Sequence, residues 1–190
     1  MSQGTPEILQ ILDDTKLLGV IISADLTWRK NTKRLVLKSY QRTIILKKLY
    51  EFQVPVKDLV TIYTLFIRSM LEQSCVVWHS AITQEETADL ERVQKVCLRI
   101  ILKQEYQTYE QALERTGLVT LEDRRSTLCL NFARKCVKNE ATKYMFPMNP
   151  SGHNMVTREP EKYKVQYART DRLAKSTIPY LQKLLNENQC

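Results

Sequence analysis

The sequence predicts a mainly α-helical protein, in which an N-terminal β-hairpin is followed by a bundle of about five helices and an extended C-terminal tail with a short helix. Four glycines and six prolines among 190 residues are too few for a sandwich of many strands and turns. A 43% share of hydrophobic residues, with 26% charged, is typical of a globular domain and not of a disordered chain. Helices should therefore dominate one main domain.

The β-hairpin is expected within residues 1–28. Two β-prone runs, at residues 8–12 and 16–22, flank the small polar residues 13–15, which suit a tight turn. Gly19 lies inside the second run, where a glycine usually marks a bulge or a close backbone approach. Because a lone hairpin is only marginally stable in water, its apolar faces should need a partner surface in this chain or in another one.

Residues 29–139 are expected to form the helical bundle. The first helix should cover residues 28–52, which contain no Gly or Pro, and the second residues 54–78, whose wide apolar stripe predicts a buried position. The other helices are expected over residues 83–103, opened by a capping box of Thr83 and Glu86, over residues 109–117, ended by Gly117, and from Thr120 to about Asn139.

The composition changes after the bundle. Residues 140–162 are expected to be a linker, because three prolines and a Ser-Gly pair fall between residues 145 and 162. Residues 163–190 are expected to form a basic tail, with an extended arm or short strand over residues 163–173 and a terminal helix over residues 178–188.

Basic residues concentrate in the first predicted helix. The chain has a net charge of +8, and residues 29–48 contain eight bases and no acid. Four of the bases recur every four residues and so lie on one side of a helix: Lys30, Arg34, Lys38 and Arg42. This pattern predicts contacts to the phosphates of a nucleic acid, and the simpler alternative is a charged surface without a partner.

The tail contains a second group of bases, among them Arg169 and Arg172. They interleave with Tyr163 and Tyr167, whose rings are candidates for stacking on bases. Acids such as Asp171 dilute the positive charge of this region. We therefore expect the tail to be a secondary contact to nucleic acid.

No catalytic or metal centre is recognisable in the sequence. Asp13 and Asp14 are adjacent, as in the metal-binding turn of polymerases, but they are more simply explained as turn residues. Cys75 and His79 are four residues apart and could face one metal, yet further ligands at a typical spacing are lacking. We therefore expect no enzyme activity, no metal and no cofactor.

The cysteines and the first residues predict an intracellular protein, in the cytoplasm or the nucleus. The five cysteines include no close pair, and the N-terminus lacks the charged and apolar segments of a secretory signal. Cys129 and Cys136 are expected to be buried thiols on one helix face. The longest nearly apolar run, residues 17–26, is too short to cross a bilayer, so no membrane partner is expected.

Five segments resemble the C-terminal third of LINE-type (non-LTR) retrotransposon reverse transcriptases. They follow the family's order and cover nearly the whole chain: KLLGVIISADLTW (16–28), VVWHSAIT (76–83), LERVQKVCLRIIL (90–102), YEQALERTGLVTLEDRRSTLCLNFARKC (109–136) and YARTDRLAKSTIPYLQKLLN (167–186). The first segment resembles the primer-grip hairpin at the edge of the polymerase palm. The helices after it resemble the thumb and a connector.

The resemblance implies roles for particular residues. The primer grip would consist of Lys16, Leu17, Leu18, Gly19 and Val20, and the bases of residues 29–48 would face the backbone of an RNA-DNA or RNA template-primer. The fingers, the palm strands and the aromatic-x-Asp-Asp metal turn of that family have no counterpart in this sequence. The resemblance therefore implies a non-catalytic fragment that binds template-primer, and it looks like a truncated reading frame, a retrotransposon remnant or a domesticated fragment.

The alternative is a helical protein-interaction module, or an inactive remnant that binds no nucleic acid. The hairpin and the apolar stripe of residues 59–71 would then pack against a partner, and a hairpin without a cover could mediate self-association. Salt dependence separates these functions, because phosphate binding weakens steeply with salt and apolar association does not.

Overall fold

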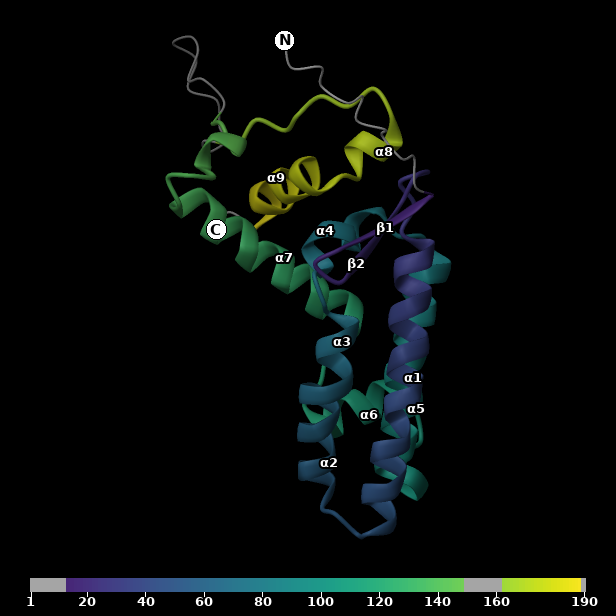
Figure 1. Cartoon of the computed structure of the whole chain (residues 1–190). Helices are drawn as coiled ribbons and strands as arrows, with labels where there is room; N and C mark the ends of the chain where they lie inside the picture. The colour runs from purple at the N-terminus through teal and green to yellow at the C-terminus, as the bar shows by residue number, and fades with distance from the viewer. Residues whose placement is uncertain (1–12, 149–161, 189–190) are drawn as a thin grey trace, which may run out of the picture.

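The computed structural model describes residues 13–148 and 162–188 and is mainly α-helical, as predicted (Figure 1). A two-stranded hairpin lies at one end of an elongated group of helices, and the C-terminal segment packs at the same end. None of the helices in the described ranges is both long enough and apolar enough to cross a membrane.

The hairpin consists of β1 (Asp14–Leu17) and β2 (Val20–Ser23), which pair antiparallel. Leu18 and Gly19 alone connect the strands, and both have a positive φ, of 48° and 85°. Two residues with positive φ form the tight turn whose twist matches that of paired strands. A residue with a β-carbon at Gly19 would also crowd the side chain of Gln73, 2.5 Å away.

The turn predicted at residues 13–15 is therefore wrong. Residues 14 and 15 belong to β1, and the chain reverses inside the second β-prone run, because Gly19 adopts a left-handed conformation that other residues rarely take. Gly19 is a turn residue and not a bulge. The first β-prone run, residues 8–12, lies outside the described residues.

The first predicted helix is confirmed to within one residue at each end as α1 (Arg29–Glu51). It ends just before Gln53, which has a φ of 57°. Its main neighbour is α5 (Gln84–Leu102), and the two helices run side by side from the hairpin end of the molecule (Figure 1). α1 buries polar Ser39 as well as Leu35 on its inner side.

The second predicted helix is broken. Its parts are α2 (Val56–Ile62), a π-helical turn η1 (Tyr63–Arg68), α3 (Ser69–Leu71), and then α4 (Cys75–Trp78), which the short 3₁₀ turn η2 (His79–Ala81) follows. Ser74, before α4, has a φ of 52°, which is incompatible with a helix interior. The single helix predicted over residues 54–78 is therefore wrong in its last third.

Tertiary contacts explain this break. The indole N–H of Trp78 donates to the Gln73 carbonyl at 3.0 Å, and the Gln73 side chain lies against Gly19 of the hairpin. Trp78 is itself fully buried. The chain bends at residues 72–74 because the indole and the hairpin bind there.

The next helices begin and end where the capping residues predict. The Thr83 hydroxyl accepts a hydrogen bond from the Glu86 N–H, and the Glu86 carboxylate accepts one from the Thr83 N–H, which confirms the capping box. The elements after α5 are η3 (Lys103–Glu105), α6 (Tyr109–Thr116), ended by Gly117 at a φ of 65°, and α7 (Leu121–Lys138), capped by the Thr120 hydroxyl.

A second, smaller core joins the C-terminal segment to α7. The terminal helix α9 (Thr177–Glu187) lies beside α7 and buries Leu181. Phe146, just after the 3₁₀ turn η4 (Lys143–Met145), is only 4% exposed in the same core. The described part of the expected linker, residues 140–148, therefore packs against the protein, because Phe146 fills this core.

Side-chain amides of α9 hold the segment that precedes it. Asn186 accepts from the Tyr163 N–H at 2.8 Å and donates to the Tyr163 carbonyl at 2.9 Å. Gln182 accepts from the Gln166 N–H at 2.8 Å. The expected arm thus lies along α9 and then forms the short helix α8 (Asp171–Ala174).

Two polar side chains of α5 hold the helices around it. Gln94 is fully buried; it accepts from the Tyr63 hydroxyl and donates to the Tyr109 hydroxyl at 2.7 Å and to the Val119 carbonyl at 2.9 Å. Glu91 accepts from the Tyr109 hydroxyl and, at 3.1 Å, from the first amide of α7. These bonds position η1, α6 and α7 around α5.

Replacing Gln94 with Leu should lower the free energy of unfolding by about 2–4 kcal/mol, because the buried Tyr63 hydroxyl would lose its partner and the half-buried bonds to Tyr109 and Val119 would also be lost. Urea unfolding followed by circular dichroism measures the change. The matched control is Gln111→Leu on the exposed side of α6, which should cost less than about 0.5 kcal/mol. Equal effects of the two substitutions would contradict the role given to Gln94.

Candidate nucleic-acid interface

α1 turns one side toward the protein and the other toward solvent. Its inner side, which includes Leu35, Ser39 and Leu46, is fully buried. Helical periodicity then places Lys33 and Leu37 on the outer side, and both are exposed. The basic helix predicted from the sequence therefore presents most of its charge to solvent.

A shallow hollow of about 420 Å³ lies on this outer side. We call it the α1 basic hollow, and its lining residues are Lys30, Lys33, Arg34, Leu37, Lys38 and Gln41. Four of these six residues are bases, and none is an acid. A concave surface of one charge sign concentrates counterions of the other sign, so the hollow suits a phosphate group.

Lys33 and Lys38 are the available cations of the hollow. Both side chains are exposed, and neither ammonium group has a hydrogen-bond or ion-pair partner within residues 13–148 and 162–188. A phosphate that binds them does not have to displace a carboxylate. These two lysines are therefore the first candidates for contacts to a polyanion.

Lys30 is shared between the hollow and the hairpin. Its ammonium lies 2.6 Å from the Asp14 carboxylate of β1. This hydrogen bond lowers the pKa of Asp14 and raises the pKa of Lys30, each relative to its ordinary value. Because both side chains are exposed, the pair contributes little stability and can open toward a stronger anion.

Arg34 fastens the hairpin to α1. Its guanidinium donates to the Gly19 carbonyl and lies 3.3 Å from the Asn31 side-chain oxygen. The same Asn31 oxygen accepts from the Ile21 N–H of β2 at 3.2 Å. Among the predicted primer-grip residues, Gly19 thus serves the turn that Arg34 holds, and Lys16 lies exposed on β1.

Arg42 lies farther along the predicted stripe and contacts the protein itself. Its guanidinium donates to the Phe66 carbonyl, and its central carbon lies 5.4 Å from the centre of the Phe66 ring. Phe66 belongs to the π-helical turn, so Arg42 joins α1 to η1. The predicted contact of Arg42 to nucleic acid stays a prediction, with this internal role added to it.

The tail brings Arg172 to the hairpin end of α1. Arg169 and Arg172 are both exposed, the second on α8. Hydrogen bonds from Thr27 lower the pKa of Asp25, and the charges of Lys30 and Arg172 lower it further. Arg172 and Lys30 therefore act on the same carboxylate, next to the start of α1.

The two tyrosines of the tail differ in exposure. Tyr163 packs edge to face on Phe146, with the ring centres 6.4 Å apart, whereas Tyr167 is 84% exposed. A ring that packs on the protein has less surface for stacking. Tyr167 is the better placed of the two predicted stacking residues.

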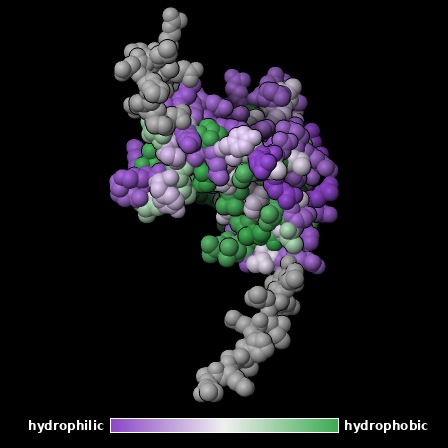
Figure 2. Space-filling view, turned by 90° about the horizontal axis from the view of Figure 1, so that it is seen from above, coloured by the Kyte–Doolittle hydropathy of each residue, from purple (hydrophilic) through white to green (hydrophobic). Residues whose placement is uncertain are grey.

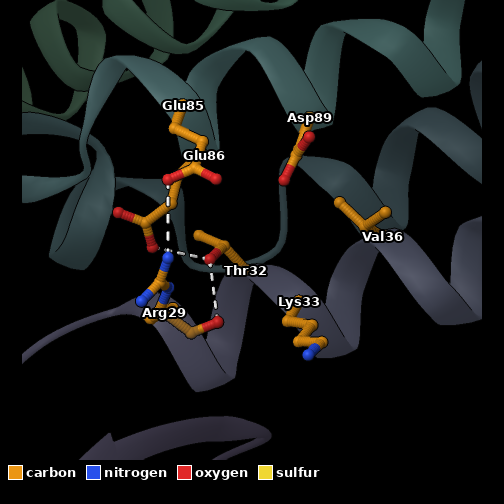
Figure 3. Close-up of a pocket in the computed structure, with 7 residues that line it drawn as sticks. All are labelled: Arg29, Thr32, Lys33, Val36, Glu85, Glu86 and Asp89. Atoms are coloured by element: carbon orange, nitrogen blue, oxygen red, sulfur yellow. Dashed lines mark hydrogen bonds and ion pairs between the residues drawn. The ribbon is translucent and has the colours of Figure 1, made fainter.

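The neighbouring flank of α1, beside α5, combines bases with acids. A second hollow of about 330 Å³ between α1 and α5 includes Arg29 and Lys33 together with three carboxylates, Glu85, Glu86 and Asp89 (Figure 3). Arg29 lies 3.4 Å from Glu85, and the Thr32 hydroxyl donates to Glu86 at 2.7 Å. The Lys33 side chain points away from these acids. Its charge therefore serves the α1 basic hollow.

The predicted stripe consists of bases four residues apart and therefore does not include Lys33. Spacing of four drifts around a helix, so the stripe of Lys30, Arg34, Lys38 and Arg42 ends at a half-buried residue. The burial of Leu35 defines the inner side of α1, and Lys33 lies on the outer side. The hydrophobic pattern of the sequence does not reveal this inner side, because four of its six buried residues are polar: Asn31, Thr32, Ser39 and Thr43.

A buried polar cluster lies elsewhere, between α4 and α7. Arg125 is fully buried, and its Nε–H donates to Nδ1 of His79 at 3.3 Å. Its guanidinium lies 5.8 Å from the Trp78 ring centre, and Nη1 and Nη2 have no hydrogen-bond partner in the described part of the chain. Cys75 and Cys129 are in contact with each other beside it, and the hydrogen bond from Cys129 lowers the pKa of Cys75. No pattern in the sequence predicts a buried arginine here.

The cysteines expected in the core are confirmed there. Cys129 is fully buried and Cys136 is 6% exposed. Among the described residues, no group of three His, Cys, Asp or Glu side chains could hold a metal ion.

Comparisons of the chain with protein-family models, with curated proteins and with solved structures find no match.

Acid should destabilise the protein through His79. Burial, and then the Arg125 charge, lower the pKa of His79 from 6.5 to about 4. Between pH 6.5 and about pH 4, the unfolded chain therefore binds a proton at His79 that the folded chain does not bind. The free energy of unfolding falls as the pH drops through this range, and His79 has no effect on it at higher pH. For a partly exposed ring the loss should be about 1–2 kcal/mol.

Urea unfolding at about pH 7 and about pH 4.5 measures this loss. His79→Gln keeps an acceptor for Arg125 and removes the titrating ring, so its stability should change less between the two pH values. The carboxylates titrate in both proteins and cancel in the difference. An identical pH dependence of the two proteins would contradict the assignment to His79.

Proposed function

We propose that the chain binds the phosphate backbone of a nucleic-acid duplex, an RNA-DNA hybrid or an RNA template-primer, through the α1 basic hollow. The observation that carries this proposal is an acid-free hollow in which Lys33 and Lys38 have no partner among the described residues. Each lysine that neutralises a phosphate releases condensed counterions, which is the main source of affinity for contacts of this kind.

The hollow suits the backbone better than the edges of the bases. Its cations are mostly lysines, which meet phosphates as point charges. Leu37 lies among them and offers carbon surface to a sugar. Contacts of this kind position a duplex by its shape and do not read its sequence.

The neighbouring elements support the same function. The hairpin with Lys16 lies beside the start of α1, held there by Arg34 and Lys30, and Arg172 approaches from the tail. A hairpin followed by a basic helix is also the order of primer grip and thumb in the reverse transcriptases that the sequence resembles. In this proposal the chain binds and positions nucleic acid and performs no chemistry.

A specific observation favours a second function, a helical protein-interaction module. Leu65 and Phe66 of the π-helical turn are 68% and 52% exposed, and Leu37 and Ile44 of α1 are more than half exposed. Large apolar side chains that are solvent-exposed near one another are typical of protein-binding surfaces. Binding that persists at high salt would favour this function.

Replacing Lys33 and Lys38 together with Gln should weaken binding to a labelled RNA-DNA hybrid about tenfold at moderate salt. It should also reduce the slope of log affinity against log salt by about two, one for each lost phosphate contact. Fluorescence anisotropy at several salt concentrations measures both. The hybrid is compared with single strands and duplex DNA to identify the preferred form.

The matched control is Lys135→Gln with Lys138→Gln, which removes the same charge from the exposed side of α7. This pair should leave the slope nearly unchanged. Equal losses in both double variants would show that net charge, and not the α1 basic hollow, causes the binding. Absence of binding by the folded wild-type chain would remove the proposal.

A further inference from the structure

The two edges of the hairpin are in different situations. The outer edge of β2 is covered by α1, because the Ile21 N–H donates to the fully buried Asn31 at 3.2 Å. All four residues of β1 are exposed, and within the part of the chain that the structure describes no strand or side chain bonds the outer edge of β1. An open edge of this kind is a template for another strand.

The register of the hairpin shows which backbone groups point outward from β1. The Ala24 N–H donates to the Asp13 carbonyl at 2.8 Å, and facing residues of an antiparallel pair alternate between bonded and non-bonded. Asp13, Thr15 and Leu17 therefore bond β2. The N–H and carbonyl groups of Asp14 and Lys16 point the other way, as the outward bond of Ile21, opposite Lys16, also indicates.

We propose that β1 pairs antiparallel with β1 of a second copy of this chain, centred on Thr15, to form a four-stranded sheet across a two-fold axis. In this register Asp14 faces Lys16 of the other copy, and Lys16 faces its Asp14. Each of these pairs consists of two outward-pointing residues, so each can exchange both backbone hydrogen bonds. The same register places opposite charges directly across from each other.

The charges select this register over its neighbours. Centred on Asp14, the strands would place two aspartates opposite each other; centred on Lys16, they would place two lysines opposite each other. In both alternatives the facing residues can also exchange backbone hydrogen bonds, so the charges of the facing side chains are what favours the Thr15-centred register. The strand is thus self-complementary in charge as well as in hydrogen bonding.

Apolar surface near the edge adds to this pairing. Figure 2 looks down on this end of the molecule and shows hydrophobic side chains gathered on one part of it, among hydrophilic ones. Leu17 and Leu18 of the hairpin are 57% and 90% exposed. In the Thr15-centred register Leu17 lies diagonally across from Thr15 of the other copy, on the same face of the sheet, and becomes partly covered. The interface is small, so the dimer forms reversibly with increasing concentration.

Charge reversal tests the proposal by sedimentation equilibrium. Lys16→Asp places Asp14 opposite an aspartate, and Asp14→Lys places Lys16 opposite a lysine, so each variant alone should dimerise about tenfold more weakly than the wild type. An equimolar mixture of the two variants places opposite charges together at both positions. It should form a heterodimer of nearly wild-type affinity. Lys47→Asp, an equal charge change on exposed α1, should leave dimerisation unchanged.

A second measurement does not depend on variants. Exchange of the Lys16 backbone amide with solvent should slow as the wild-type concentration rises, because this N–H is bonded only in the dimer. A wild-type chain that stays monomeric at all concentrations would overturn the proposal. So would folded variants whose mixture fails to recover the dimer, or single variants that dimerise as well as the wild type, since another surface would then be responsible.

Discussion

The buried amide of Gln94 is the interaction on which the arrangement of the helices depends. A buried amide without partners is costly, and Gln94 meets this cost through bonds to the π-helical turn, to α6 and to the loop before α7. Glu91, one turn earlier on α5, accepts from the hydroxyl of Tyr109, which Gln94 also binds, and from the first amide of α7. Polar satisfaction along one side of α5 therefore positions three neighbours at once.

The position of α1 follows from the same centre. α1 packs along α5 and beside the π-helical turn. This packing buries its inner side and leaves the bases of its outer side in solvent. Two bases of α1 donate to backbone carbonyls and so join parts of the protein: Arg34 binds the Gly19 turn and Arg42 binds Phe66. Lys33 and Lys38 have no such neighbour among residues 13–148 and 162–188, which is why the proposed phosphate contacts are assigned to them. One helix thus provides both internal fasteners and an external charge.

The covered and open edges of the hairpin have the same origin. α1 binds β2 through Asn31 and the turn at Gly19 through Arg34, so among the described strands β1 is the one with an open edge. Lys30 reaches Asp14 of that exposed strand, which places the proposed pairing edge beside the α1 basic hollow. A two-fold sheet would bring two such hollows into one particle, and linked sites raise the apparent affinity for a long polyanion without a new contact.

The sequence by itself determined what depends on neighbours within a few residues: the extents of α1, α5, α6, α7 and α9, the capping box at Thr83, the glycine end of α6 and the basic outer side of α1. Helical periodicity and caps are local, so they are readable from a pattern. Tertiary structure alone decided the turn at Gly19, the break before α4, the packing of Phe146 and the burial of Arg125. It also divided the predicted bases into bound Arg34 and Arg42 and available Lys38, because such a division depends on which distant carbonyl, ring or carboxylate the fold brings within hydrogen-bonding distance.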